Sequence, residues 1–239
     1  MINNKKVLAM IPARGGSKGI KNKNILGIQG KPLITYTIEA AQNSVYIDDI
    51  VVSTDSEKIK QISEQYNAWV PFLRPAELAM DETPTIDAVL YTVHKLREMG
   101  YQYDILVLLQ PTSPLRTGDD IDGAIKVFAH NAYQPLVSVS SVSDHPILIR
   151  SIGDNGHLEK LLQVENSSVR RQDMPLYYRV NGSIYINLIC EINQGTSFND
   201  NPIPYIMERN HAIDIDHYLD VALVEYCLCN MQAEREELN

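Results

Sequence analysis

The chain of 239 residues has little cysteine, and its three cysteines are Cys190, Cys227 and Cys229. An odd number at this spacing supplies neither a disulfide framework nor a four-ligand zinc pattern, so we expect a reducing compartment. No apolar run approaches the roughly 20 residues that a membrane helix needs. The first run, residues 7–13, ends at Arg14 and lacks the features of a secretory signal. These absences predict a soluble, cytoplasmic protein.

Acidic residues are absent from positions 1–38, although the whole chain is acidic, with a formal net charge of −9. The acidic balance argues against a general nucleic-acid surface, because such a surface needs a basic stripe. The same 38 residues contain seven cations, namely Lys5, Lys6, Arg14, Lys18, Lys21, Lys23 and Lys31. Glycine and apolar residues are interleaved with them, which favours a binding segment for a small anion over a solvated basic tail.

Apolar runs alternate with helical periodicity along most of the chain. Strands are expected at residues 7–11, 49–53, 69–73, 105–109, 136–142, 183–188 and 203–207. Helices are expected at residues 33–42, 57–66, 85–99, 121–129 and 218–231, followed by a polar tail. This rhythm predicts one α/β domain over residues 1–239, with a mostly parallel, Rossmann-like sheet and helices on both faces. The alternation degrades over residues 146–178, which we interpret as an inserted dimerisation arm.

The loop I-P-A-R-G-G-S-K-G-I-K-N-K-N, residues 11–24, directly follows the first predicted strand. Ligands of open α/β sheets bind at this carboxyl edge. The loop has three glycines, which let the backbone approach a ligand closely, and three cations suited to phosphate, Arg14, Lys18 and Lys23. It fits neither the Walker A pattern nor G-x-G-x-x-G. Spacing alone leaves a flexible surface loop equally open.

Seven stretches, in order, resemble the sugar cytidylyltransferases, specifically the CMP-sialic acid (acylneuraminate) synthetases. They are the loop at 11–24, V-V-S-T-D at 51–55, L-R-P-A-E-L-A at 73–79, L-L-Q-P-T-S-P-L-R at 108–116, R-Q at 171–172, Y-R-V-N-G-S-I-Y at 178–185 and I-D-I-D at 213–216. The resemblance implies a nucleotidyltransferase fold and a homodimer. It also implies transfer of CMP from CTP to the anomeric hydroxyl of a nonulosonic acid, a nine-carbon α-keto acid sugar resembling sialic acid, with release of pyrophosphate.

On the nucleotide side, the resemblance assigns the triphosphate to the N-terminal loop. Arg14 and Lys23 are the candidates for stabilising the charge that develops on the phosphates. The expected CTP contacts are Pro12, Ala13, Arg14, Ser17, Asn24, Arg74 and Thr85. The groups at Pro12 and Ala13 are backbone groups, and Arg74 and Thr85 would contact the base and ribose. An alternative role for Arg74 is a cap on a helix that begins after Pro75.

On the sugar side, Gln110 follows the predicted buried strand at 105–109 and would face the ligand crevice. Thr112 and Ser113 behind it have a turn role as an alternative. Arg171 would pair with the sugar carboxylate, because a guanidinium makes a two-pronged contact with that group. The sugar contacts implied by the resemblance are Gln110, Arg171, Gln172, Arg179, Asn181 and Tyr185. Where the arm crosses to a second subunit, each site would be completed by the partner.

Asp214 and Asp216 are two residues apart, so an extended segment directs both carboxylates to one face and Ile213 and Ile215 to the other. Two adjacent carboxylates suit Mg²⁺, which binds one or two carboxylates together with phosphate oxygens. In the resemblance, the pair holds this ion and Asp216 is also a catalytic residue. The base that takes the sugar proton is either one of these carboxylates or a hydroxide on the metal. Asp216 could at the same time cap the following helix.

The identity of the sugar stays open, because bacterial relatives of this family activate N-acetylneuraminate, legionaminate, pseudaminate or the eight-carbon KDO. A regulator that binds nucleotide without turnover is an alternative of another class, although the acid pair argues against it. A glycosyltransferase that uses a D-x-D motif and a finished nucleotide sugar is a third interpretation. Release of pyrophosphate from CTP distinguishes the first interpretation from the other two.

Overall fold

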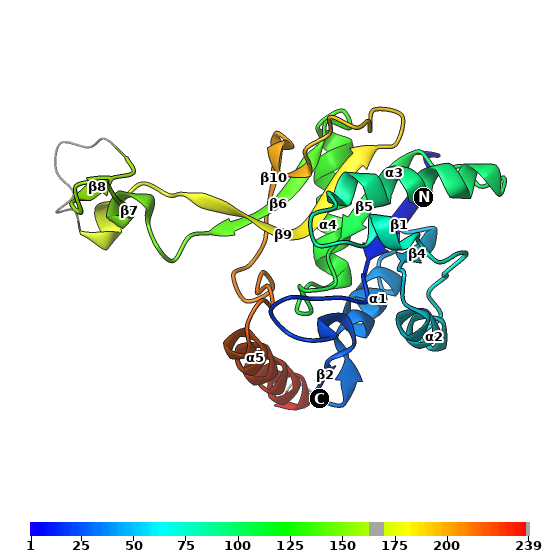
Figure 1. The fold of residues 1–239 in the computed structure, drawn as a ribbon, viewed down its shortest axis with the longest axis horizontal. Coiled ribbons are helices and arrows are strands. Elements are labelled where there is room, and N and C mark those ends of the chain that lie inside the picture. Colours follow the sequence, from blue (N-terminus) through cyan, green and yellow to red (C-terminus); the bar gives the residue numbers. More distant parts are fainter. Residues whose placement is uncertain (163–169, 238–239) are drawn as a thin grey trace.

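A mixed sheet forms the centre of the protein in a computed structural model that describes residues 1–162 and 170–237 (Figure 1). Within these residues, the central sheet has the strand order β10-β6-β9-β5-β1-β4. β9 runs antiparallel to its neighbours β5 and β6, and the other pairings are parallel. The strands are β1 (Val7–Pro12), β4 (Asp49–Ser53), β5 (Ile105–Leu109), β6 (Leu136–Ser141), β9 (Tyr178–Leu188) and β10 (Ile203–Ile206). The predicted mostly parallel α/β fold is confirmed.

The two faces of the sheet bury separate apolar clusters. Successive side chains of β1 alternate between them, with Ala9 and Ile11 in one cluster and Leu8 and Met10 in the other. This alternation explains why a strand buried on both faces is an unbroken apolar run. Helices α1, α2 and α4 pack in the first cluster and α3 in the second. Their bounds are α1 (Leu33–Gln42), α2 (Glu57–Gln65), α3 (Thr85–Glu98) and α4 (Gly118–His130).

A third, smaller apolar cluster joins the N-terminal loop to the C-terminal part of the chain. Ile20 and Ile28 pack there with Ile215 and with Val224. Val224 belongs to α5 (Tyr218–Glu237), which lies beside the N-terminal segment in Figure 1. The N-terminal elements next to this cluster are the 3-10 helix Lys23–Ile25 and the hairpin of β2 (Gly27–Ile28) and β3 (Lys31–Pro32). Apolar packing therefore holds the basic loop and the acid pair together.

The segment that follows β6 leaves the sheet. It contains the 3-10 helix Pro146–Leu148 and a short antiparallel hairpin of β7 (Arg150–Ile152) and β8 (Leu158–Lys160). A further 3-10 helix, Arg171–Asp173, precedes β9. Figure 1 shows the hairpin projecting away from the central sheet. This shape suits an inserted arm, and its role in dimerisation stays a prediction.

Several expected boundaries are wrong. Residues 69–73 form no regular strand but two isolated parallel bridges, Val51–Trp69 and Thr54–Leu73. β9 begins at Tyr178 instead of residue 183, because its first part pairs with β6 beyond a register shift. α5 continues to Glu237 through most of the expected polar tail, whose glutamate, arginine and alanine residues are good helix formers. In the described part of the chain, no helix combines the length and apolarity needed to cross a bilayer.

Candidate functional site

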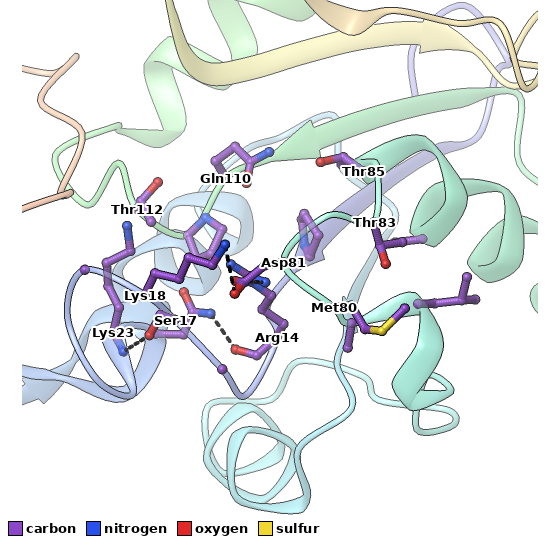
Figure 2. A pocket seen from close by; sticks show the side chains of 18 of the residues that line it. Arg14, Ser17, Lys18, Lys23, Met80, Asp81, Thr83, Thr85, Gln110 and Thr112 are labelled. Atoms are coloured by element: carbon purple, nitrogen blue, oxygen red, sulfur yellow. Dashed lines mark hydrogen bonds and ion pairs between the residues drawn. The ribbon is translucent and has the colours of Figure 1, made fainter.

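A cavity of about 510 Å³ opens at the carboxyl edge of the sheet (Figure 2). Pro12 at the end of β1, Gln110 directly after β5 and Thr85 at the start of α3 line it. Most nucleotide candidates from the sequence lie in its wall, together with the sugar candidate Gln110 and one of the two predicted metal ligands. These residues are Pro12, Arg14, Ser17, Lys23, Asn24, Arg74, Thr85, Gln110 and Asp216.

The N-terminal loop is internally hydrogen-bonded rather than an open surface loop. The Ser17 hydroxyl donates to the carbonyl of Ile20 at 2.5 Å and accepts from the backbone N–H of Lys23 at 3.0 Å. The Asn24 side-chain amide donates to the carbonyl of Arg14 at 3.0 Å. These bonds fix the backbone that presents the cations, so Ser17 and Asn24 shape the loop as well as line the cavity.

Ala13 and Arg74 lie behind the cavity opening. Ala13 is buried, is not part of the cavity wall, and donates its backbone N–H to Ser53 at 2.9 Å. Arg74 is only 6% exposed, and its Nε has no hydrogen-bond partner among the described residues. Burial lowers the pKa of Arg74, Asp55 opposes this effect, and Arg14 adds to it. The 3-10 helix Ala76–Leu78 has no side-chain cap, so the capping alternative for Arg74 finds no support.

Each of the three loop cations in the cavity wall is paired with a carboxylate. Arg14 and Lys18 both contact Asp81, the latter at 3.3 Å, and Figure 2 shows the Asp81 carboxylate between them. Burial raises the pKa of Asp81, but hydrogen bonds from Lys18 and Arg14 outweigh it and lower that pKa. Lys23 pairs with Asp216 at 3.1 Å. Two carboxylates therefore pair with the three loop cations, which leaves this group of side chains with a net positive charge.

Lys23 is the contact between the N-terminal loop and the acid pair. Its Nζ donates to the carbonyl of Ile215 at 2.6 Å and to Oδ1 of Asp216 at 3.1 Å. Gly19 packs directly on the same segment, because a Cβ at this position would lie 2.8 Å from the carbonyl oxygen of Asp216. The fully buried Ile215 anchors the segment in the third apolar cluster. Residues nearly 200 positions apart in sequence thus meet at one edge of the cavity.

Asp214 and Asp216 both line a second cavity, of about 640 Å³, which shares Asp216 and His217 with the first. Oδ1 of Asp214 is buried without a hydrogen-bond partner among the described residues. Burial raises the pKa of Asp214, and Asp216 and Asp220 raise it further, whereas a hydrogen bond from Thr112 and the charge of Lys23 lower it. Asp214 is therefore a carboxylate that lacks a sufficient counter-charge.

The expected capping role of Asp216 belongs to another residue. The Asp220 carboxylate accepts the backbone N–H groups of Asp216, at 2.9 Å, and of His217, at 2.7 Å. An acid in the first turn of α5 can reach back to these free donors, and it leaves the 67% exposed Asp216 side chain directed at Lys23. The alternative role of Asp216 as a helix cap therefore finds no support among the described residues.

The second cavity contains three of the sugar candidates, Arg179, Asn181 and Tyr185. The Tyr185 hydroxyl donates to Asn199 at 2.8 Å, and Asn181 accepts from the Ser138 hydroxyl at 2.6 Å. Both side chains line the cavity, but their polar groups already hydrogen-bond within the protein.

Arg171 and Gln172 lie elsewhere, in the 3-10 helix of the projecting segment. Gln172 is exposed and lines neither cavity, and the Arg171 side chain lies outside what the structure describes. Of these two residues, Gln172 is therefore not brought to either cavity in the described part of the chain.

Sequence reasoning missed two residues that shape the site. The role of Asp81 could not be predicted, because nothing in the sequence indicates which cations an acidic residue before a helix will contact. Arg116 is the last residue of the stretch at 108–116, and it has no separate role in the sequence-based prediction. It is buried and donates to the carbonyls of Gln110, at 3.2 Å, and Ser183, at 2.7 Å, and to the Thr37 hydroxyl, at 2.7 Å. The available signal that the Gln110 loop has a buried anchor is a lone arginine shortly after the apolar strand at 105–109.

Solved structures share this architecture at low sequence identity. A CMP:2-keto-3-deoxy-manno-octonic acid synthetase complexed with CTP matches with a TM-score of 0.69 and 16% identity, over 95% of this chain and 99% of that one. A 4-diphosphocytidyl-2C-methyl-D-erythritol synthase matches with a TM-score of 0.67 and 13% identity, over 94% and 99%. The fold is that of the nucleotidyltransferases.

Three sequence relatives of this chain have names that describe a CMP-sugar synthase or a cytidylyltransferase. The chain is 39% identical over 222 residues to the CMP-N,N'-diacetyllegionaminic acid synthase of Legionella pneumophila, covering 92% of this chain and 95% of that protein. It is 36% identical to the N-acylneuraminate cytidylyltransferase of Escherichia coli over 91% of this chain, but spans about half, 51%, of that protein. It is 30% identical to the pseudaminic acid cytidylyltransferase of Campylobacter jejuni, over 90% and 93%.

A profile of the cytidylyltransferase family matches residues 8–226. The chain belongs to the cytidylyltransferase family, and it is an enzyme of the nucleotidyltransferase class. The family predicted from the seven stretches is confirmed.

Proposed function

We propose that the protein transfers CMP from CTP to the anomeric hydroxyl of a nonulosonic acid and releases pyrophosphate. The sugar oxygen forms a bond to the α-phosphorus, the bond from that phosphorus to the β-phosphate oxygen breaks, and the hydroxyl proton leaves to a base. The observation that carries this proposal is the contact of Lys23 with Asp216, which joins a cationic phosphate loop to an acid pair between two adjoining cavities.

The first cavity would take the nucleotide. Arg14 and Lys23 would contact the phosphates, where fixed cations stabilise the charge that develops during transfer without reorganisation of solvent. Arg74, Thr85 and the backbone near Pro12 would contact the base and ribose. The unpartnered Nε of the buried Arg74 supports this assignment, because a buried guanidinium donor otherwise lacks an acceptor.

The acid pair fits Mg²⁺. Oδ1 of Asp214 is buried and has no partner among the described residues, Asp216 lines the same cavity, and carboxylate oxygens are the donors this ion prefers. Among the described residues, no group of three or more His, Cys, Asp or Glu forms a complete site, which suits an ion that also takes phosphate oxygens. Asp214 and Asp216 would hold the ion, which when bound would neutralise phosphate charge. Asp214 or Asp216 would also accept the sugar proton.

The second cavity would take the sugar. It adjoins the nucleotide cavity at Asp216 and contains Arg179, a candidate partner for the sugar carboxylate, together with Asn181 and Tyr185. Gln110 lies on the nucleotide side of the same region. The relatives described above carry names with different nonulosonic acids, which supports this class of sugar without selecting one member.

A panel of substrates tests the proposal. The protein with Mg²⁺ is given CTP, ATP, GTP or UTP together with N-acetylneuraminate, N,N'-diacetyllegionaminate, pseudaminate or KDO, and pyrophosphate is measured. We expect release with CTP and at least one nonulosonic acid, and loss of release with EDTA. Silence with every acid, together with retained CTP binding, would instead identify a regulator. Binding of nucleoside diphosphates without pyrophosphate release would identify a glycosyltransferase.

We further propose that the protein is a homodimer formed through the arm. Three apolar side chains of the projecting segment, Ile152, Leu158 and Leu176, are between 70% and 80% exposed. Arg171 and Gln172 lie on the same segment, and the described Gln172 side chain lines neither of the two cavities. A partner that received this segment would gain the two residues beside its second cavity.

Mixing inactive variants tests this arrangement. Arg171→Ala and Asp216→Asn homodimers are each expected to be nearly inactive, and co-refolded mixtures should regain up to about a quarter of wild-type turnover, because random pairing restores one complete site per mixed dimer. A monomer in sedimentation velocity, or no recovery in the mixture, would contradict shared sites.

A further inference from the structure

Asp81 occupies the part of the nucleotide cavity where phosphate would be bound. It is the common partner of Arg14 and Lys18, and all three side chains line the cavity. Figure 2 shows the carboxylate directed between the two cations rather than outward. The side chains of Arg14 and Asp81 are about one third exposed, and that of Lys18 is largely exposed. Water and ligands can therefore reach all three.

The loop before α3 presents this side chain through its own hydrogen bonds. The Thr83 hydroxyl donates to the carbonyl of Glu77 at 2.9 Å, and the backbone N–H of Thr83 donates to the carbonyl of Met80 at 3.2 Å. The next acid, Glu82, does not line the cavity. The contact with the cations therefore depends on the position of Asp81 and not on the overall acidity of the loop.

The contact of Asp81 with Arg14 and Lys18 affects how a phosphate ligand binds to and leaves the cavity. A triphosphate that binds Arg14 and Lys18 must replace the carboxylate, because each cation has a limited set of donors directed into the cavity. The reverse holds when pyrophosphate departs. A carboxylate that returns to the same cations stabilises the emptied cavity, so the free energy needed to remove a polyanion is smaller.

We propose that Asp81 is an internal competitor of the β- and γ-phosphates, one that weakens binding of CTP and pyrophosphate and thereby promotes release of pyrophosphate. This inference rests on the proposed function, because it needs the loop to hold phosphate. It assigns Asp81 an exchange role that differs from the base, ribose, metal and sugar contacts described above.

Binding of inorganic pyrophosphate and of CMP, measured by calorimetry at low ionic strength in EDTA, tests the proposal without turnover. Asp81→Asn removes the charge and keeps the size of the side chain. Loss of two partly exposed ion pairs predicts that this variant binds pyrophosphate about three- to thirtyfold more tightly. Affinity for CMP should change less than about twofold, because CMP lacks the two phosphates that compete with Asp81.

Two control variants separate this effect from others. Glu82→Gln removes an equal charge from the neighbouring position and should leave pyrophosphate affinity unchanged. Asp81→Glu keeps the charge and should remain close to the wild type. Equal tightening by Glu82→Gln would show a general charge effect and overturn the proposal, as would unchanged or weaker binding by a folded Asp81→Asn variant. A wild type that binds neither ligand would overturn the proposed function instead, and this inference with it.

Discussion

Replacement of Asp214 by asparagine tests the acid pair through the stability of the fold rather than through turnover. The carboxylate lies close to two other acids, Asp216 and Asp220, and its Oδ1 is buried without a partner in the described structure. A residue selected for stability alone would not be expected here. We predict that Asp214→Asn abolishes pyrophosphate release and at the same time stabilises the metal-free protein at neutral pH.

The magnitude follows from the contacts of this side chain. A buried polar group without a partner costs about 1–3 kcal/mol and a charged group costs more, but the hydrogen bond from Thr112 and the charge of Lys23 recover part of that cost. Asparagine keeps the size of the side chain and removes the charge. We therefore expect the free energy of unfolding to rise by about 1–2 kcal/mol.

The pH dependence has a definite sign. Burial raises the pKa of Asp214 above its ordinary value of 3.8, so the folded protein holds this proton more tightly than the unfolded chain. The free-energy cost of the ionised Asp214 carboxylate in the folded protein is absent below pH 3.8. It develops as pH rises from 3.8 to the raised pKa, and it is complete above the raised pKa. The advantage of Asp214→Asn should therefore be present at pH 7.5 and disappear as pH falls toward 4.

Urea unfolding at both pH values, with EDTA, measures this difference. Asp216→Asn is the matched control, because its carboxylate is 67% exposed and paired with Lys23, so it should lose at most about 1 kcal/mol. Mg²⁺ with CTP should stabilise the wild type more than the Asp214→Asn variant, since ligands stabilise the state they bind. A destabilised Asp214→Asn protein at pH 7.5, or a difference that persists unchanged at low pH, would refute the reasoning.

Two further predictions concern the segment around the acid pair. Gly19→Ala places a Cβ 2.8 Å from the carbonyl of Asp216 and should lower turnover at least tenfold by separating Lys23 from Asp216. Gly27→Ala, with open space around it and outside the cavity wall, should leave kcat near the wild type. Equal effects of the two variants would contradict this. His211 contacts Asp120 at 2.9 Å, and this carboxylate raises the pKa of His211 despite the opposing effect of burial. The pair should add about 0.5–1 kcal/mol below pH 6.5, relative to His211→Gln, and lose it as pH rises through the raised pKa. Unfolding experiments that show a constant difference from pH 6 to 9 would exclude the pair as its source.

Much of the fold was predictable because buried parallel strands have a direct pattern. The run at 105–109 corresponds to β5, and the helix predicted at 85–99 corresponds to α3, which ends one residue earlier. The direction of β9 was not predictable, since apolar alternation indicates a strand but not the neighbours with which it pairs. Residues 69–73 show the same limit, because β-prone residues there make only two bridges.

The site divides in a similar way. The resemblance brought Lys23 and Asp216 together, and the structure supplies the physical cause, which is the packing of Ile20 against Ile215. The partners of the charges were not predictable. Asp81, Asp220 and Arg116 act through contacts distant in sequence or through helix-end geometry, and residue type alone does not assign such contacts.

A double-mutant cycle on Lys23 and Asp216, with pyrophosphate release as the readout, tests most directly whether the two ends of the chain form one reaction centre. Lys23→Met and Asp216→Asn should each lower kcat by about 10²–10³, the range seen when one preorganised charge-stabilising group is removed. Because the two residues act as a unit, kcat of the double variant should be only slightly lower than kcat of the less active single variant. Losses that multiply, or single variants with wild-type turnover, would contradict the account.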